Sequence, residues 1–504
     1  MSQKSSVSLF KNRQEVVMLV ALNALLGLVS FCYGLARALK DQFTLYYGGP
    51  LLISLSKLLV IPSMFFLKFL YDTVNKHTNA NGRFYIVTSY FIAFFALFLF
   101  IYKTGIIEKL ELSWAGRMAQ QYKRFETPFT GIQYWPSLLF YIHAEGIGTF
   151  MLSVLVWTFI NATMSLDQSK RLYTLLSLGA AVSTFFAGYV ATMQVSNTIL
   201  FAVIIACMFC LMLAYYLFYL YKNQYPELFV AVQPKKKKKK LTFVESIKLL
   251  ITHKESKYLL LITALVLCYT IYVPLVEAFH KSYVKGLGDS LQLRNGVRYF
   301  TGVQLRNIGI FSFFTVLILG PLSARSSWFV RAMLTPLVLT LGTISFFITI
   351  FYTDSVVALA EKFNLFNRFG ILSHLPSGAD IASIKSGYVK VSAGMLLVIV
   401  GKSFKYIFFD STKEGAYVPL DSETKVNAKA AIDGAFSRVG KGIGSFYIMI
   451  ISLIMGTGKD LLGIKYFIIV LLIITLLIWL FSITKLSGMY DAKVAKQASS
   501  PSKK

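Results

Sequence analysis

Long apolar runs separated by short polar segments are the dominant pattern of the chain. A transmembrane helix needs about 20 mostly apolar residues, because the hydrocarbon layer is about 30 Å thick. Runs of that length predict about twelve transmembrane helices in two groups of six. The first group is expected at residues 16–36, 51–71, 84–102, 137–159, 172–193 and 198–221, and the second at residues 258–279, 308–324, 328–352, 391–409, 443–455 and 461–484. The run at 443–455 is short and flanked by glycine, so a count of eleven stays open.

This pattern predicts an all-α polytopic membrane protein made of two six-helix halves. The expected N-terminal half covers residues 1–221, a basic linker covers 222–257, and a C-terminal half with a basic tail covers 258–504. The first apolar run has full spanning length and no small-residue cleavage site after it. We therefore expect a retained helix there rather than a signal peptide.

Composition supports the membrane class, and the distribution of charge indicates an orientation. Of the 504 residues, 56% are hydrophobic and 15% are charged, unlike an ordinary soluble domain. Much of the net charge of +28 comes from lysines at both ends of the chain and in the linker, above all the run at residues 235–240. Because positive loops are retained in the cytoplasm, the central basic loop and both termini are expected there. The lysine run has no interleaved aromatic residues, so it indicates membrane lipids as partners and not nucleic acid.

The sequence contains near matches to enzyme motifs, and each lacks a required residue. Residues 401–403 read Gly-Lys-Ser, like the end of a phosphate-binding loop, but Leu396 stands where the first glycine is required. Cys207 and Cys210 have no second pair, and the five histidines include no His-Glu-x-x-His motif. We therefore expect no catalytic residue, no cofactor and no metal site. A twelve-span chain without its own energy-coupling site is expected to be a secondary transporter rather than an enzyme or a pump.

Charged residues inside the predicted spans are the main candidates for function. Each costs at least about 2.5 to 3.5 kcal/mol on insertion scales, so its presence needs a reason. Arg37, Lys40 and Asp41 share one helical face, and Glu277 and Lys281 lie one turn apart. The charged residues that stand out in or beside the spans are Arg37, Lys40, Asp41, Lys57, Glu145, Glu277, Lys281, Lys402, Lys405 and Lys413.

Cations outnumber carboxylates in this set, which suits an anionic solute. Lysine and arginine can replace water around phosphate oxygens, so a phosphate ester is expected, and a nucleotide fits that description. Lys57 and Lys405 have no carboxylate one helical turn away in the sequence. We expect one cavity between the halves to collect the cations Arg37, Lys40, Lys57, Lys405 and Lys413.

One long stretch resembles a known family. Residues 405–421, KYIFFDSTKEGAYVPLD, are similar to the signature of the ATP/ADP translocase family of plastids and obligate intracellular bacteria. The segments around Glu145 and Glu277 also resemble that family. The resemblance implies a nucleotide carrier with a major-facilitator-like fold that exchanges ATP and ADP, and we expect it in a bacterial inner membrane. It also implies that helix charges, among them Lys40 and Lys413, serve transport.

Together the residues and the resemblance indicate a substrate-binding site. Its candidates are Arg37, Lys40, Lys57, Glu145, Glu277, Lys281, Lys405, Asp410, Lys413 and Arg438. The carboxylates Glu145 and Glu277 would repel phosphate, so we expect them to pair with cations in the empty carrier or to accept a proton. Glu145 has no basic residue one turn away in the sequence, so it is the better candidate for a proton.

Two departures from the family keep another substrate and another coupling mode open. Ala38 stands where the family has an acidic residue, and Ile147 stands where it has tryptophan. The first change would leave Arg37 and Lys40 with fewer partners, and the second would alter packing beside Glu145. Proton-coupled import of a nucleoside triphosphate other than ATP is therefore the alternative to exchange.

Two further classes of protein are more distant alternatives. A membrane enzyme acting on a phosphorylated lipid would need a nucleophile or a metal constellation. Only residues 410–414 offer a candidate, and that segment lacks histidine and a second carboxylate cluster. A receptor or scaffold would not need unpaired lysines among its spans.

Overall fold

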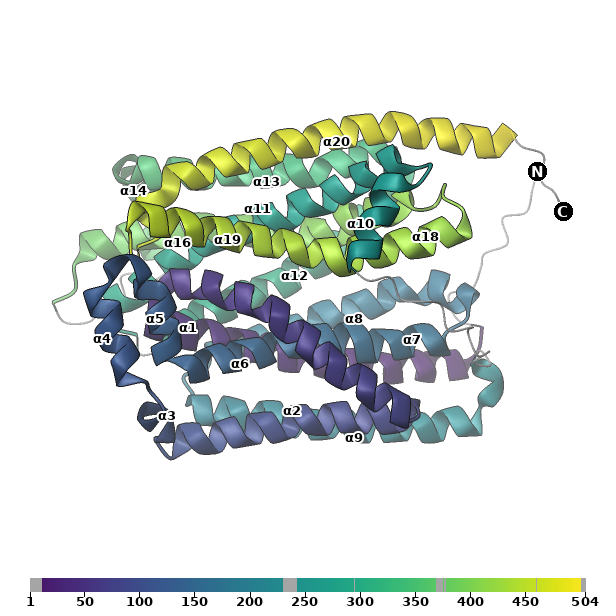
Figure 1. Cartoon of the computed structure of the whole chain (residues 1–504), viewed down its shortest axis with the longest axis horizontal. Coiled ribbons are helices and arrows are strands. Elements are labelled where there is room, and N and C mark those ends of the chain that lie inside the picture. Colours follow the sequence, from purple (N-terminus) through teal and green to yellow (C-terminus); the bar gives the residue numbers. More distant parts are fainter. Residues whose placement is uncertain are drawn as a thin grey trace.

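The fold is helical throughout the part of the chain that the structure describes. The structure is a computed structural model that describes residues 11–229, 243–293, 295–368, 375, 378–458 and 460–499. Within these ranges it contains helices and turns but no strand. Figure 1 shows most helices running along the long axis of the molecule, as in a membrane bundle. The lysine run of the expected linker lies outside the described residues, so its cytoplasmic placement stays a prediction.

The helices before the central linker are numbered along the chain. They are α1 (Arg13–His77), α2 (Ala80–Lys103), α3 (Ile106–Lys109), α4 (Ser113–Gln121), η1 (Lys123–Phe125), α5 (Glu126–Gln133), α6 (Trp135–Gly146), η2 (Ile147–Val156), α7 (Trp157–Thr163), α8 (Leu166–Thr192), α9 (Asn197–Gln224) and η3 (Pro226–Leu228). The segments α6, η2 and α7 follow one another without a break and form one rod long enough to cross a membrane.

The helices after the linker follow the same pattern. They are α10 (Phe243–Thr252), α11 (Ser256–Ser290), α12 (Gly296–Arg325), α13 (Trp328–Phe351), α14 (Thr353–Lys362), α15 (Leu365–Arg368), α16 (Ile381–Phe404), η4 (Lys405–Phe409), α17 (Asp410–Ala416), α18 (Ser422–Lys429), η5 (Ala430–Phe436), α19 (Ser437–Met455), η6 (Leu462–Ile464) and α20 (Lys465–Ser499). The segments α16, η4 and α17 again form one continuous rod.

The structure confirms an all-α polytopic membrane protein. Among the described residues, ten helical segments are long and apolar enough to cross a membrane. The first of them, Arg13–Val74, has 62 residues, which suffices for two crossings. It breaks at Gly49, where φ is 70° and ψ is −170°, so α1 consists of two arms. The apolar part of α8, Leu178–Thr192, is shorter than these segments. The choice between eleven and twelve crossings therefore stays a prediction.

Several helices are longer than the hydropathy pattern predicts. The first span was expected to end near residue 36, yet the first arm of α1 stays helical until Gly49. α12 begins at Gly296, well before the expected start at residue 308, and α19 begins at Ser437 instead of residue 443. Polar side chains on an inner helix face need not end a membrane helix, because the bundle interior shields them from lipid. The hydropathy pattern therefore underestimates helices that line a polar interior.

Two clusters of buried side chains form the interior. The first is built mainly from α1, α2, α6 and α9, and within it the rings of Phe43 and Phe140 meet edge to face at 5.5 Å between centroids. The second is built mainly from α11, α13, α16 and α20, where the buried ring of Trp479 lies 6.0 Å from that of Tyr269. Such aromatic pairs stabilise packing beyond their buried area. The boundaries of the two halves at residues 221 and 258 remain a prediction.

α8 and α12 pack against each other at close range. A Cβ atom at Gly188 would lie 2.2 Å from the backbone nitrogen of Arg306, and one at Gly309 would lie 2.5 Å from that of Phe185. Glycine is needed at both positions, because any side chain would collide with the backbone of the other helix. This contact fixes how the two helix groups sit around the space between them.

Candidate substrate-binding site

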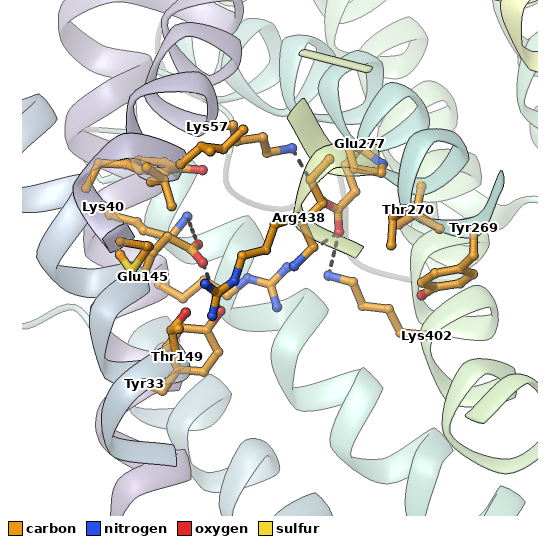
Figure 2. Close-up of a pocket in the computed structure, with 18 of the residues that line it drawn as sticks. Tyr33, Lys40, Lys57, Glu145, Thr149, Tyr269, Thr270, Glu277, Lys402 and Arg438 are labelled. Carbon is orange, nitrogen blue, oxygen red and sulfur yellow. Dashed lines mark hydrogen bonds and ion pairs between the residues drawn. The ribbon is translucent and has the colours of Figure 1, made fainter. Parts of the chain in front are cut away.

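A cavity of about 290 Å³ lies between the two helix groups. This volume is near the lower end of the range of about 300 to 1,000 Å³ for small-molecule sites. Figure 2 shows that residues of α1 and α6 face residues of α11, α16 and α19 across it. Its lining comprises Tyr33, Arg37, Lys40, Lys57, Val60, Ile61, Met64, Tyr141, Glu145, Thr149, Tyr269, Thr270, Val273, Pro274, Glu277, Lys281, Lys402, Lys405, Arg438 and Lys441.

The lining is strongly cationic. Among the described residues it holds eight cations, which are Arg37, Lys40, Lys57, Lys281, Lys402, Lys405, Arg438 and Lys441. Only two carboxylates of the described chain line it, Glu145 and Glu277. Such an excess in a partly enclosed space focuses a positive potential on a solute, which favours an anion with several charges.

The Glu277 carboxylate contacts three of these cations. Its Oε1 atom lies 2.5 Å from the Lys402 ammonium and 3.4 Å from the Arg37 guanidinium. Its Oε2 atom lies 3.9 Å from the Lys57 ammonium. Figure 2 shows Lys57 and Lys402 approaching Glu277 from opposite sides. The three cations come from both arms of α1 and from α16, so one carboxylate holds together helices from both groups.

Glu145 has a second set of partners. Its Oε1 atom lies 2.9 Å from the Lys40 ammonium, and the Tyr33 hydroxyl donates to its Oε2 atom at 3.4 Å. The same ammonium lies 3.8 Å from the centroid of the Tyr141 ring and 3.3 Å from Asp41. These contacts hold Lys40 almost fully buried. Glu145 therefore has a close basic partner from α1, which its own sequence neighbourhood did not indicate.

Three π-helical segments lie beside the cavity in the part of the chain that the structure describes. They are η2, which follows Glu145, η4, which begins at Lys405, and η5, which precedes Arg438. π-Helical segments inside α-helices are frequent at functional sites. In η4 the Lys405 ammonium contacts the Asp410 carboxylate at 2.6 Å, five residues away. The expectation that Lys405 has no local carboxylate is wrong, because it assumed α-helical spacing.

The structure brings most of the predicted site residues together. Eight of the ten candidates line the cavity. Asp410 does not line it and lies behind Lys405 as an ion-pair partner. Lys413 does not line it either, and contacts Asp433 at 3.0 Å. The expectation that Lys413 converges on the cavity with the other cations therefore fails, because its partner is a carboxylate of η5.

The candidate set omitted several lining residues. Lys402 lies three residues before Lys405, so both fall on one face of the helix, and this spacing was visible in the sequence. Lys441 lies at the cavity but has a glycine on each side in the sequence, so nothing local marks it. Tyr141 and Tyr269 also line the cavity, and tyrosine is too common in membrane helices to signal a site.

Neither departure from the family pattern faces the cavity. Ala38 and Ile147 are both fully buried in the first hydrophobic cluster and do not belong to the lining. Arg37 and Lys40 have carboxylate partners from α11 and α6 despite the missing acid at position 38. Ala38 and Ile147 therefore do not contact a solute in the cavity directly, and their effect on partners and packing stays a prediction.

Comparison with known proteins gives matches over nearly the whole chain. The sequence pattern of the TLC ATP/ADP transporter family matches residues 6–490. The ADP,ATP carrier protein 1 of Rickettsia prowazekii is 30% identical over 502 residues, covering 94% of this chain and 93% of that carrier. The ADP,ATP carrier protein 3 of Rickettsia felis is 27% identical over 508 residues, covering 95% of each chain.

Proposed function

The chain belongs to the TLC ATP/ADP transporter family, and from this premise we propose that it is a secondary transporter that exchanges ATP and ADP. The observation that carries the proposal is the cation-rich cavity between the two helix groups. A charged hydrogen bond to an anion contributes about 1.5 to 3 kcal/mol, so a few such contacts suffice to bind a nucleotide phosphate chain. The proposed role is transport, with no chemical change in the substrate.

The phosphate chain binds where Glu277 now holds three cations. Arg37, Lys57 and Lys402 already converge on two oxygens of one carboxylate, which resembles the geometry of a single phosphate group. Lys405 and Arg438 extend the positive surface toward a second phosphate. Asp410 orients Lys405 and contacts no substrate, whereas Lys413 acts outside the cavity through its pair with Asp433.

Exchange follows from the ion pairs of the empty carrier. Arg37 and Lys57 lie on α1, and Glu277 lies on α11, so their contacts tie the two groups together. A bound phosphate takes over these cations and frees the helices to move. Without a nucleotide, Arg37 and Lys57 would have to leave Glu277 with no anion to replace its carboxylate, and a partly buried charge without a partner is unfavourable. The carrier therefore reorients readily only when loaded.

The proposal includes a topology and a membrane. The two moving units are residues 1–221 and 258–504, joined by the basic linker 222–257. Both termini and the linker lie in the cytoplasm of a bacterial cell whose inner membrane holds the protein, and basic residues contact anionic lipids. The clustering of lysine and arginine in the linker and at both chain ends supports this orientation.

Uptake of labelled ATP by vesicles that contain the purified full-length protein tests the proposal. We expect uptake only when the vesicles hold ADP or ATP, and we expect no effect of a protonophore. Uptake into empty vesicles that a protonophore abolishes would instead establish proton-coupled import, and competition by other triphosphates would identify its substrate. Recovery of unchanged ATP from the vesicles distinguishes transport from an enzymatic reaction.

A further inference from the structure

Two ion pairs join α1 to α11 in the same register. Arg37 contacts Glu277 at 3.4 Å, and one turn further along both helices Asp41 contacts Lys281 at 2.8 Å. The order of charge is reversed between the helices: α1 carries a cation and then an anion, and α11 carries an anion and then a cation. Because higher numbers pair with higher numbers, the two helices run in the same direction here.

The two pairs differ in their relation to the cavity. Arg37 and Glu277 both line it, and 22% of the Arg37 side chain is exposed there. In the second pair only Lys281 reaches the lining, and Asp41 is 1% exposed. The first pair is therefore accessible to a solute in the cavity, and the second lies behind it. We call Asp41 and Lys281 the outer pair.

Beyond the outer pair the two helix groups stay in contact. Gln42, the residue after Asp41, donates to the Asn295 side chain at 2.7 Å. Arg298 of α12 is almost fully buried and donates to the Asn197 side chain at 2.8 Å and to the carbonyl of Met193 at 2.9 Å. These contacts hold the two helix groups together toward the end of the bundle that contains Asn295 and Gly49, which we call the Gly49 end. The outer pair thus lies between the cavity and these contacts.

We infer that Asp41 and Lys281 are positioning residues that gate the cavity at the Gly49 end, and that the pair Arg37–Glu277 links this gate to the bound nucleotide. The inference rests on the proposed function. A phosphate that draws Arg37 away from Glu277 removes the inner tie between α1 and α11. Lys57 of α1 also contacts Glu277 and is drawn to the phosphate in the same way. The outer pair then still joins α1 to α11, and its opening exposes the cavity to the Gly49 side.

A pair of charges suits a gate that must open repeatedly. When the helices part, water enters and hydrates both Asp41 and Lys281, so the open form loses little solvation. When they close, each charge is again matched by the other. Lys40 also lies 3.3 Å from Asp41, so this carboxylate keeps a cationic partner while the gate is open. A neutral residue at position 41 would remove the carboxylate that Lys281 contacts, and a neutral residue at position 281 would remove the contact that ties Asp41 to α11.

Accessibility of a cysteine in the cavity tests the gate. Thr149 lines the cavity on η2, and Thr149→Cys reports access by a membrane-impermeant thiol reagent added to one side of oriented vesicles. We expect labelling from the Gly49 side to be at least tenfold slower than from the opposite side. Asp41→Asn or Lys281→Gln should abolish that difference, and Asp41→Glu, which keeps the charge, should restore it. The parent without the introduced cysteine gives the background from Cys207 and Cys210.

A matched control is available one turn further along α11. Lys285 and Asp289 form an ion pair of 2.8 Å within that helix alone, so Asp289→Asn removes a pair that joins no two helices. Labelling should keep its sidedness in this variant. Sidedness that survives Asp41→Asn and Lys281→Gln, or that is lost equally in Asp289→Asn, would overturn the gate.

A second measurement does not depend on the stability of single variants. Asp41→Cys combined with Lys281→Cys can be bridged by a short bifunctional thiol reagent. The bridge should stop exchange and a reductant should restore it, while the bridged protein still binds ATP from the other side. Exchange that continues when the two cysteines are bridged contradicts the inference. A parent protein that binds no nucleotide would contradict the proposed function instead, and the labelling result would still decide the gate.

Discussion

At the scale of single residues, Glu277 occupies the place where the proposed phosphate binds. Its carboxylate contacts Arg37, Lys57 and Lys402, so it competes with the substrate for the same cations. Glu277→Gln removes this competitor. We expect ATP to bind about tenfold more tightly, which equals about 1.4 kcal/mol, and exchange to slow because release depends on the carboxylate returning to its partners.

Calorimetric titration of ATP and the rate of exchange in vesicles check this prediction. Glu361→Gln is the control, because Glu361 is exposed and pairs with Lys385 at 2.7 Å outside the cavity. Exposed pairs contribute about 0 to 1 kcal/mol, so neither measurement should change. Weaker ATP binding in Glu277→Gln would show that Glu277 organises the cations without competing for them.

Lys402 has the closest contact with Glu277 and should contact phosphate directly. Lys402→Gln should weaken ATP binding by tenfold or more, because a charged hydrogen bond contributes about 1.5 to 3 kcal/mol. Lys402→Arg should restore only part of the affinity, since a planar guanidinium differs from an ammonium in reach and shape. The comparison with Lys285→Gln, which changes an exposed lysine of α11, separates a local effect from a general loss of charge. Unchanged affinity in Lys402→Gln would exclude this lysine from the site.

At the scale of helices, the close contact of α8 with α12 depends on glycine. Gly188→Ala places a methyl group against the backbone of Arg306 and Gly302, and overpacking of this kind costs about 1 to 3 kcal/mol. We expect a lower thermal unfolding midpoint and slower exchange. Gly286→Ala in α11 is the control, because no described atom lies within 4 Å of the added carbon. Alanine there should stabilise the helix by up to about 1 kcal/mol.

A thermal unfolding scan of the purified variants in detergent, together with exchange in vesicles, distinguishes these outcomes. A Gly188→Ala protein as stable and as active as the parent would show that the two helices can separate at this point without cost. In that case the glycines would not fix the position of the two helix groups.

The sequence predicted the crossings better than their ends. Apolar length indicated a bundle of about twelve spans, and ten described segments are long and apolar enough to cross, the first of them long enough to cross twice. Hydropathy did not show that the first arm of α1 continues to Gly49, since Arg37 and Lys40 face an interior that exists only once the bundle has formed. The ion pair of Glu145 was not predictable from its sequence neighbours either, because its partner Lys40 lies on another helix.

The π-helical segments explain why some contacts expected from helical spacing differ from those in the structure. Spacing arguments assume 3.6 residues per turn, and in η4 that assumption separates Lys405 from Asp410, which are in contact. Lys413 shows the reverse error. Its separation of 11 residues from Lys402 is close to three α-helical turns, but a π segment intervenes and Lys413 contacts Asp433.

At the scale of the whole molecule, the positive cavity makes binding depend on salt. Among the described residues the lining has six more cations than carboxylates. Salt screens such a field, with a Debye length that falls from about 10 Å at 0.1 M to about 3 Å at 1 M. We expect the Kd for ATP to rise severalfold between these concentrations. Adenosine, which has no phosphate, should compete weakly and without a dependence on salt. Equal salt dependence for both compounds would contradict binding through the phosphates.

The same excess of cations exposes the carrier to the membrane potential. Moving one elementary charge through the whole field changes the free energy by about 2.3 kcal/mol per 100 mV. The lining charges lie between the two helix groups. When the carrier reorients, the drop in membrane potential shifts from one side of these charges to the other. An empty carrier with unmatched cations therefore feels the voltage, whereas a bound triphosphate cancels most of that charge. The membrane voltage would then determine which side the cavity of an empty carrier faces. Binding of ATP would make the orientation of the carrier nearly independent of voltage.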